Sequence, residues 1–236
     1  MAAAYTTGAI IVAAGRGTRM GGADKCALPL RGRSLVSYSV EAFAPVVDAM
    51  VVVVAADCVA AWTATAAQEA WSHIATIVAG GETRQESVRA GFDALRTMRA
   101  VDAIAVHDGA RPLISVETIR QCIAQGWLDG AAITAVPVTD TIKRVIDGRI
   151  VETLDRATLW AAQTPQAFRA DLLHAAFAWA DSLPHDPFTD EASLVEAFGR
   201  PVAIVRGDRA NIKVTEPADL TIAEALLGAQ AGAVHA

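Results

Sequence analysis

Short apolar runs recur along this chain, and helix-length amphipathic segments separate most of them. The run from Val51 to Val54 has no polar alternation, which is typical of a strand covered on both faces. Because strands that alternate with helices form parallel sheets, we predict an α/β fold with a mostly parallel central sheet. The predicted strands are 9–14, 49–55, 75–79, 103–106, 131–138 and 202–205, and the predicted helices are 34–43, 59–70, 85–96, 116–125, 170–180, 191–198 and 217–227.

One segment, 139–158, breaks the alternation. Two strand-like stretches, 141–146 and 149–153, flank Asp147-Gly148, a favoured two-residue hairpin turn. A two-stranded ribbon is marginally stable alone in water, so the arm is expected to pack on its own domain or, preferentially, on a second subunit. No repeat or linker divides the rest, and 236 residues suit one core, so residues 1–236 are predicted to form a single domain.

Composition excludes several classes of protein. The net charge of −6 argues against a nucleic-acid surface. No apolar run approaches the roughly 18 residues of a membrane span. The first eight residues lack a signal-peptide pattern, which favours a cytoplasmic location. Cys26, Cys58 and Cys122 are scattered and indicate neither a zinc site nor a disulfide framework.

A glycine-rich loop with cationic side chains follows the first predicted strand. Gly15 and Gly17 permit a sharp turn that brings N–H groups close to a ligand, and Arg16, Arg19 and Lys25 add positive charge. The spacing departs from the dinucleotide fingerprint G-x-G-x-x-G, and no P-loop sequence occurs. This combination favours a polyphosphate site, although an ordinary turn with solvated cations would explain the loop taken alone.

Polar residues also follow other predicted strands, where ligands bind in open parallel sheets. After 75–79, paired glycines permit close approach of the backbone, and Glu82 or Ser87 could contact a base edge. After 103–106, Asp108 is suited to hold Mg²⁺ together with phosphate oxygens, or to pair with Arg111 and fix its own loop. His107 is predicted to be structural.

Three later features are ambiguous. The segment 163–168 is interpreted as a proline turn with polar groups around it. Thr189 is predicted to cap a helix, as is Ser115 for an earlier one. Lys213 lies between two apolar residues, and an ordinary surface lysine fits as well as a ligand-binding one.

Six motifs together, in this order, resemble the 2-C-methyl-D-erythritol 4-phosphate cytidylyltransferase family. They are 13–20, 107–112, Asp155-Arg156, 164–166, 189–193 and 211–215. The first alone would indicate only the wider nucleotidyltransferase superfamily. The resemblance implies a Rossmann-like, GT-A-like three-layer sandwich, and a homodimer clasped through the arm 139–158. It also implies a reaction of non-mevalonate isoprenoid biosynthesis, in which CTP and methylerythritol phosphate give the CDP-linked alcohol and pyrophosphate with Mg²⁺.

The resemblance also assigns roles. Arg19 and Lys25 would stabilise charge on the triphosphate, whereas Arg156 and Lys213 would position the substrate phosphate, and Asp108 would hold Mg²⁺. The residues implied around the nucleotide are Ala13, Ala14, Gly15, Gly17, Gly81, Glu82, Ser87, Asp108 and Gly109. Those implied around the second substrate are Arg111, Thr141, Arg156, Thr164 and Thr189, with Thr141 and Arg156 serving the partner subunit's site.

The chain departs from the family pattern in small ways. Asp24-Lys25-Cys26 stands where Pro-Lys-Gln is common, and Gly109 stands where alanine is common. We expect the transferase alone, without the cyclase domain of fused members. Two rival functions remain: a sibling enzyme acting on another polyol phosphate such as ribitol 5-phosphate, and a catalytically silent nucleotide-binding protein. The cations for both reacting groups argue against the silent protein, because a binder needs only one set.

Overall fold

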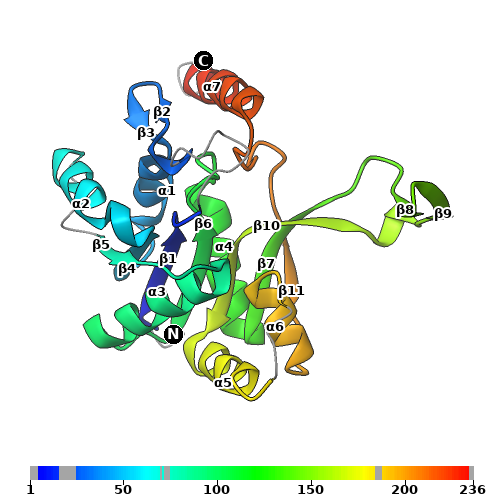
Figure 1. Ribbon diagram of the computed structural model, residues 1–236, viewed down its shortest axis with the longest axis horizontal. Helices are drawn as coiled ribbons and strands as arrows, with labels where there is room; N and C mark the ends of the chain where they lie inside the picture. The colour runs from blue at the N-terminus through cyan, green and yellow to red at the C-terminus, as the bar shows by residue number, and fades with distance from the viewer. Residues whose placement is uncertain (1–4, 16–24, 70, 72–74, 184–187, 234–236) are drawn as a thin grey trace.

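A seven-stranded sheet lies at the centre of the molecule, in the order β11-β7-β10-β6-β1-β4-β5 (Figure 1). The computed structural model describes residues 5–15, 25–69, 71, 75–183 and 188–233, with the backbone alone at 25 and 230–233. All neighbouring pairs are parallel except those of β10, which runs antiparallel to both β6 and β7. The strands are β1 Thr7–Val12, β4 Ala49–Val54, β5 Thr76–Ala79, β6 Ala103–Asp108, β7 Ala131–Pro137, β10 Trp160–Arg169 and β11 Ala203–Arg206.

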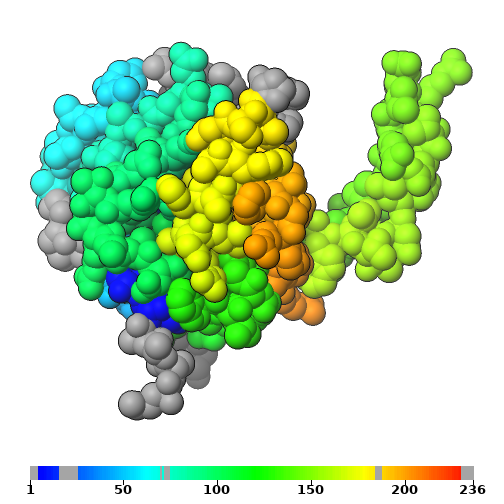
Figure 2. Space-filling model, turned by 90° about the horizontal axis from the view of Figure 1, so that it is seen from below, coloured from blue at the N-terminus to red at the C-terminus, as the bar shows by residue number. Residues whose placement is uncertain are grey.

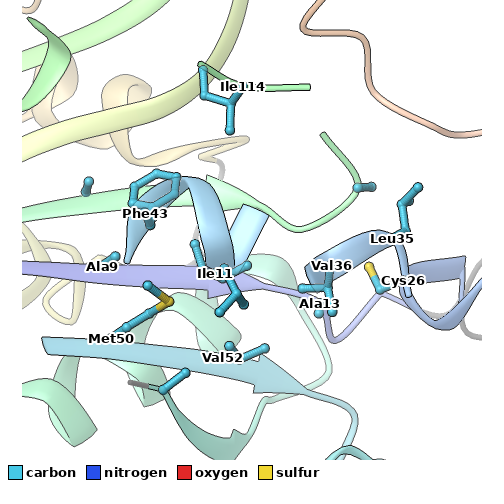
Figure 3. Close-up of a cluster of buried hydrophobic side chains, with 14 of the residues drawn as sticks. Ala9, Ile11, Ala13, Cys26, Leu35, Val36, Phe43, Met50, Val52 and Ile114 are labelled. Atoms are coloured by element: carbon cyan, nitrogen blue, oxygen red, sulfur yellow. The ribbon is translucent and has the colours of Figure 1, made fainter. Parts of the chain in front are cut away.

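Helices cover both faces of the sheet and make the predicted three-layer sandwich. Successive β1 residues point to opposite faces, so Ile11 packs in one buried cluster with α1 and α4, and Ile10 packs in another with α3, α5 and α6. Figure 3 shows the first cluster, with Ile11 between Phe43 and Val52. The helices are α1 Leu35–Phe43, α2 Val59–Gln68, α3 Arg84–Met98, α4 Val116–Asp129, α5 Ala170–Ala180, α6 Glu191–Ala197 and α7 Pro217–Ala233, with 3-10 turns η2 Lys25–Ala27, η3 Ala56–Cys58 and η4 Arg156–Thr158.

The interpretation of 163–168 as a proline turn was wrong, because these residues lie within β10. The pairing of β10 with β7 shifts register between Ala162 and Gln166, and Pro165 sits in that interruption. Proline cannot donate a hydrogen bond to a neighbouring strand, so it is tolerated where the ladder is broken. The short ribbon of β2 (Pro29–Leu30) and β3 (Arg33–Ser34) was also not predicted.

Two helix caps were predicted, and one is confirmed. Ser115 caps α4 by accepting a hydrogen bond from the backbone N–H of Thr118. The cap of α6 is Asp190 and not Thr189. The Asp190 carboxylate accepts a hydrogen bond from the Ser193 N–H, and the Ser193 hydroxyl accepts one from the Asp190 N–H. A carboxylate is also favoured at the positive end of the helix dipole.

The predicted arm is confirmed as a hairpin that projects from the body of the molecule (Figure 1, Figure 2). Strands β8 (Lys143–Ile146) and β9 (Arg149–Thr153) pair antiparallel, and the turn residues Asp147 and Gly148 both have positive φ, 47° and 74°. Such angles are those of a type I′ turn. All residues of both strands are exposed.

None of the helices within the described ranges combines the length and the hydropathy needed to cross a bilayer.

Candidate active site

A cavity of 660 Å³ opens at the carboxyl ends of four parallel strands, β1, β4, β5 and β6. This is the edge of an open parallel sheet at which ligands bind. The lining residues are Val12, Ala13, Ala14, Gly15, Cys26, Ala55, Ala56, Gly80, Gly81, Glu82, Thr83, Arg84, Ser87, Asp108, Ala110 and Lys213.

The glycines after β5 are required by the close packing of the cavity wall. A Cβ on Gly80 would lie 2.5 Å from the Ser87 Oγ and 2.8 Å from the Ala14 Cβ. Thr83 then starts α3 with a capping box in which its hydroxyl and the Glu86 carboxylate satisfy each other's backbone N–H. At Gly80 and Gly81 the cavity wall is therefore bare backbone, which leads into the N-terminus of α3, a favourable position for an anion.

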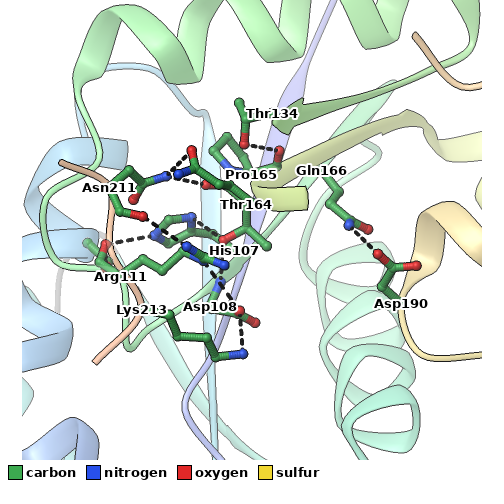
Figure 4. Close-up of polar contacts among 12 residues, drawn as sticks. His107, Asp108, Arg111, Thr134, Thr164, Pro165, Gln166, Asp190, Asn211 and Lys213 are labelled. Atoms are coloured by element: carbon green, nitrogen blue, oxygen red, sulfur yellow. Dashed lines mark hydrogen bonds and ion pairs between the residues drawn. The ribbon is translucent and has the colours of Figure 1, made fainter. Parts of the chain in front are cut away.

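Asp108, the last residue of β6, lies on the floor of the cavity among three cationic side chains of the described residues, of which Figure 4 shows Lys213 and Arg111. The Lys213 Nζ is 2.7 Å from its Oδ2, the Arg111 Nε is 3.7 Å from the same oxygen, and the Arg84 Nε is 3.4 Å from Oδ1. Burial raises the pKa of Asp108, but the charges of Lys213 and Arg84 outweigh it and hold this pKa well below its usual range. Asp108 is therefore a carboxylate at any ordinary pH.

Below Asp108, a buried chain of hydrogen bonds orients the floor of the cavity. The Arg111 carbonyl can only accept, so His107 carries its hydrogen on Nε2 and donates to that oxygen at 3.2 Å. The Nδ1 of the neutral ring then accepts from the Thr164 hydroxyl at 2.9 Å, and the Thr164 Oγ1 accepts from the Asp108 N–H at 3.0 Å. Burial lowers the pKa of His107 to about 4, which keeps the ring neutral. The prediction of a structural His107 agrees with this geometry.

A second set of contacts places Lys213. Asn211 is fully buried, and its Nδ2 donates to the Thr164 carbonyl at 2.9 Å. The Arg111 guanidinium donates to the Asn211 carbonyl at 2.8 Å, and the Val214 N–H donates to the Ala110 carbonyl at 2.8 Å. These contacts hold the backbone on both sides of Lys213 against the loop after β6. The lysine is thus aimed at Asp108 and is not an ordinary surface residue.

The structure brings many of the predicted site residues together and separates others. Thr164 does not line the cavity, since its hydroxyl is used beneath Asp108, and Gly109 packs behind the wall with its N–H donating to the Val12 carbonyl at 2.9 Å. Arg156 and Thr141 lie at the base of the arm, and Thr189 is exposed beside α6. The predicted residues found around the cavity are Ala13, Ala14, Gly15, Gly81, Glu82, Ser87, Asp108 and Lys213, with Arg111 behind Asp108. Gly17, Arg19 and the side chain of Lys25 lie outside the described residues.

Sequence reasoning missed Arg84. It lies in the loop after β5 that drew attention for its glycines, and only its place as the first residue of a helix at a strand end could have marked it. Its guanidinium contacts Asp108 and, with Nη1, both carboxylate oxygens of Glu191 at 2.8 and 3.0 Å. The sequence separation of Arg84 and Glu191, 107 residues, hides this pair.

The chain matches known proteins along nearly its full length. A protein described as 2-C-methyl-D-erythritol 4-phosphate cytidylyltransferase from Geobacter metallireducens is 41% identical over 226 residues, covering 93% of this chain and 96% of that protein. The structure of 4-diphosphocytidyl-2C-methyl-D-erythritol synthase from Anaerococcus prevotii has a TM-score of 0.82 at 29% identity, covering 95% of this chain and 96% of that one. That of the Francisella tularensis cytidylyltransferase has a TM-score of 0.79 at 31% identity, covering 94% and 99%.

The model of one family matches residues 7–229, which include the cavity, the Asp108 cluster and the arm. Its description names the same activity as the relatives. This chain therefore belongs to the 2-C-methyl-D-erythritol 4-phosphate cytidylyltransferase family.

Proposed function

We propose that this protein transfers the cytidylyl group of CTP to 2-C-methyl-D-erythritol 4-phosphate, giving 4-diphosphocytidyl-2-C-methyl-D-erythritol and pyrophosphate. The reaction is a step of non-mevalonate isoprenoid biosynthesis. Besides family membership, one observation carries the proposal. The partly exposed Lys213 pairs with the buried Asp108 carboxylate on the floor of a cavity that glycine backbone lines in part.

The chemistry requires charge to be neutralised and two anions to be aligned. A phosphate oxygen of methylerythritol phosphate forms a bond to the α-phosphorus of CTP, and the bond from that phosphorus to the β-phosphate oxygen breaks. The pyrophosphate leaves with the electron pair, so no nucleophile on the protein is needed. Fixed cations lower the barrier by stabilising the charge that develops on phosphate oxygens. In this mechanism Lys213 would contact the attacking phosphate. A radiolabelled nucleotidyl-enzyme formed without the alcohol would contradict direct displacement.

The donor set fits Mg²⁺ bound mainly by the substrate. The described residues contain no cluster of three His, Cys, Asp or Glu side chains that could hold a metal. Mg²⁺ often takes only one or two carboxylates together with phosphate oxygens and water, and Asp108 on the cavity floor supplies one. When bound, the ion would withdraw charge from the triphosphate. Asp108 also pairs with Lys213, so a bound Mg²⁺ would share this carboxylate with the lysine.

The arm supports a homodimer in which each subunit completes the other's site. Val145, Ile146, Ile150 and Val151 each expose more than half of their surface on a ribbon that two strands alone would barely stabilise. Arg156, with its Nη1 donating to the Thr139 carbonyl at 2.7 Å, is fixed at the base of this arm and away from the cavity lining of its own chain. In the dimer, Arg156 and Thr141 would serve the partner subunit's cavity. The net charge of −6 also argues against nucleic-acid partners.

Pyrophosphate release from CTP tests the function directly. We expect release with methylerythritol phosphate and Mg²⁺, and little when the metal is chelated. Ribitol 5-phosphate in place of methylerythritol phosphate is the matched control. A preference for ribitol phosphate would identify the sibling activity, and no release with either alcohol would identify a silent binder.

A further inference from the structure

Arg84 lies between two buried carboxylates that come from opposite sides of the site. Asp108 ends β6, and Glu191 begins α6. The Arg84 Nη1 is 2.8 and 3.0 Å from the two Glu191 oxygens, and its Nε is 3.4 Å from the Asp108 Oδ1. One guanidinium therefore ties the carboxylate on the cavity floor to a helix that does not line the cavity.

Glu191 is itself held rigidly. Its side chain is only 1% exposed. Gln166 of β10 fixes the start of α6 from below, because its Nε2 donates to Asp190 at 2.8 Å and its Oε1 accepts from the Ala192 N–H at 3.1 Å. Burial raises the pKa of Glu191 despite its pairing with Arg84. A buried ion pair is seldom the most stable solution for a core, so this pair points to a role beyond stability.

The cluster around Asp108 contains one more cation than carboxylates, and Lys213 is the cation that can leave it. Three cations, Arg84, Arg111 and Lys213, face two carboxylates, Asp108 and Glu191, in this cluster of described residues. If Lys213 turns to a substrate phosphate, two cations and two carboxylates remain and balance. Lys213 is also the most exposed of the three, with 37% of its side chain accessible against 27% for Arg84 and 12% for Arg111. The lysine can therefore leave without stranding a buried charge.

We propose that Arg84, anchored by Glu191, is a positioning residue that keeps the Asp108 carboxylate aimed into the cavity when Lys213 turns to the substrate phosphate. The inference rests on the proposed function, and it adds two residues that touch no substrate group in that mechanism. Arg84 is the fixed cation of the site, and Lys213 is the movable one. Such supporting contacts determine how accurately a reactive group is held.

The test compares Arg84→Gln, Arg84→Lys and Glu191→Gln with Arg89→Gln as the matched control. Arg89 lies on the same helix, has the same 27% exposed side chain and forms a 2.6 Å ion pair with Asp181, but it does not contact Asp108. We expect Arg84→Gln and Glu191→Gln to lower kcat about tenfold or more and to weaken Mg·CTP binding in calorimetry, as loss of supporting contacts does in other sites. Arg84→Lys should recover part of the loss, because one ammonium keeps the charge but cannot span both carboxylates. Arg89→Gln should keep kcat within about twofold of the unaltered chain, because the contacts that it removes, with Asp181 and the Phe177 carbonyl, do not involve Asp108.

A second readout does not depend on catalysis. Calorimetry should show weaker Mg·CTP binding in Arg84→Gln and Glu191→Gln and unchanged binding in Arg89→Gln, because only the first two changes release Asp108 from its tie to α6. Wild-type kcat and Mg·CTP binding in Arg84→Gln or in Glu191→Gln would overturn the proposal. Thermal unfolding of each variant separates misfolding from mispositioning, and if Arg84→Gln does not fold, Arg84→Lys and Glu191→Gln decide. If the unaltered chain releases no pyrophosphate, the proposed function fails while Mg·CTP binding by the variants still decides the role of Arg84.

Discussion

The cavity end of the sheet and the hairpin arm are built in opposite ways. Around the cavity, Asp108, His107 and Asn211 are buried, and the charge of Asp108 is compensated within the chain. On the arm, both strands are exposed, and four large apolar side chains face solvent. Contacts within one chain therefore fix the cavity, whereas the arm exposes apolar side chains that another molecule could cover.

Of the changes considered, removing the Lys213 ammonium should have the largest effect on activity. We expect Lys213→Met to lower kcat/KM by about 100- to 1000-fold, because it takes away the cation proposed to contact the reacting phosphates. Stability should change little, since Arg84 and Arg111 still compensate Asp108. Steady-state kinetics and thermal unfolding measure the two effects, and a parallel loss of both would mean that Lys213 is part of the folded framework.

The pH dependence of folding tests the buried floor of the cavity. Burial lowers the pKa of His107 from 6.5 to about 4, so between these values the unfolded chain binds a proton that the folded chain does not. Stability contributed by the neutral ring is therefore fully present above pH 6.5 and falls as pH drops toward 4, by about 3 kcal/mol. Urea unfolding from pH 7 to pH 4.5 checks this, with His107→Gln as the comparison that should flatten the slope. The same slope in both proteins would assign the effect to other groups.

Thr164→Val should destabilise the fold by about 2 kcal/mol, because it leaves the Asp108 N–H and the His107 Nδ1 buried without partners. The side-chain volume is nearly unchanged, so the loss of stability measures the contribution of the Thr164 hydroxyl. Chemical denaturation gives the stability. Kinetics should show kcat falling more than the KM for methylerythritol phosphate rises, whereas the reverse would place Thr164 in direct contact with that substrate.

Changing the arm should have the smallest effect, a loss of activity of about tenfold, since it misplaces the Arg156 proposed to act in the partner's site. Val145 and Ile150 face each other across the ribbon, so Val145→Lys with Ile150→Glu keeps a favourable cross-strand pair. Sedimentation should show a monomer whose unfolding is otherwise unchanged. A dimer of full activity would show that the arm is not the contact.

The sequence was informative wherever local pattern determines structure. The run Val51 to Val54 predicts a strand covered on both faces, and Asp147-Gly148 predicts a hairpin turn. Residues that follow parallel strands were expected to meet at one edge of the sheet. These predictions rest on side-chain phase and turn chemistry, which act over a few residues.

The features that sequence reasoning missed depend on contacts between residues that are distant in the chain. Strand β10 was missed because Pro165 and its polar neighbours resemble a turn, and only pairing on both sides makes them a strand. Arg84 was missed because Glu191, its partner, is distant in sequence and lies in a segment that reads as an ordinary helix start. The role of Thr164 beneath Asp108 follows from β10 and could not be seen before it.

The position of β10 restricts where members of such a family can gain or lose residues. It leaves the arm at Trp160 and reaches Thr164, under Asp108, only a few residues later. Insertions or deletions at the arm tip, near Asp147, lie beyond this stretch and leave the cavity floor in place. A residue added between Trp160 and Thr164 would fall where the pairing of β10 with β7 already shifts register, next to the threonine that supports Asp108. We therefore expect changes in length to be tolerated better at the tip of the arm than at its root.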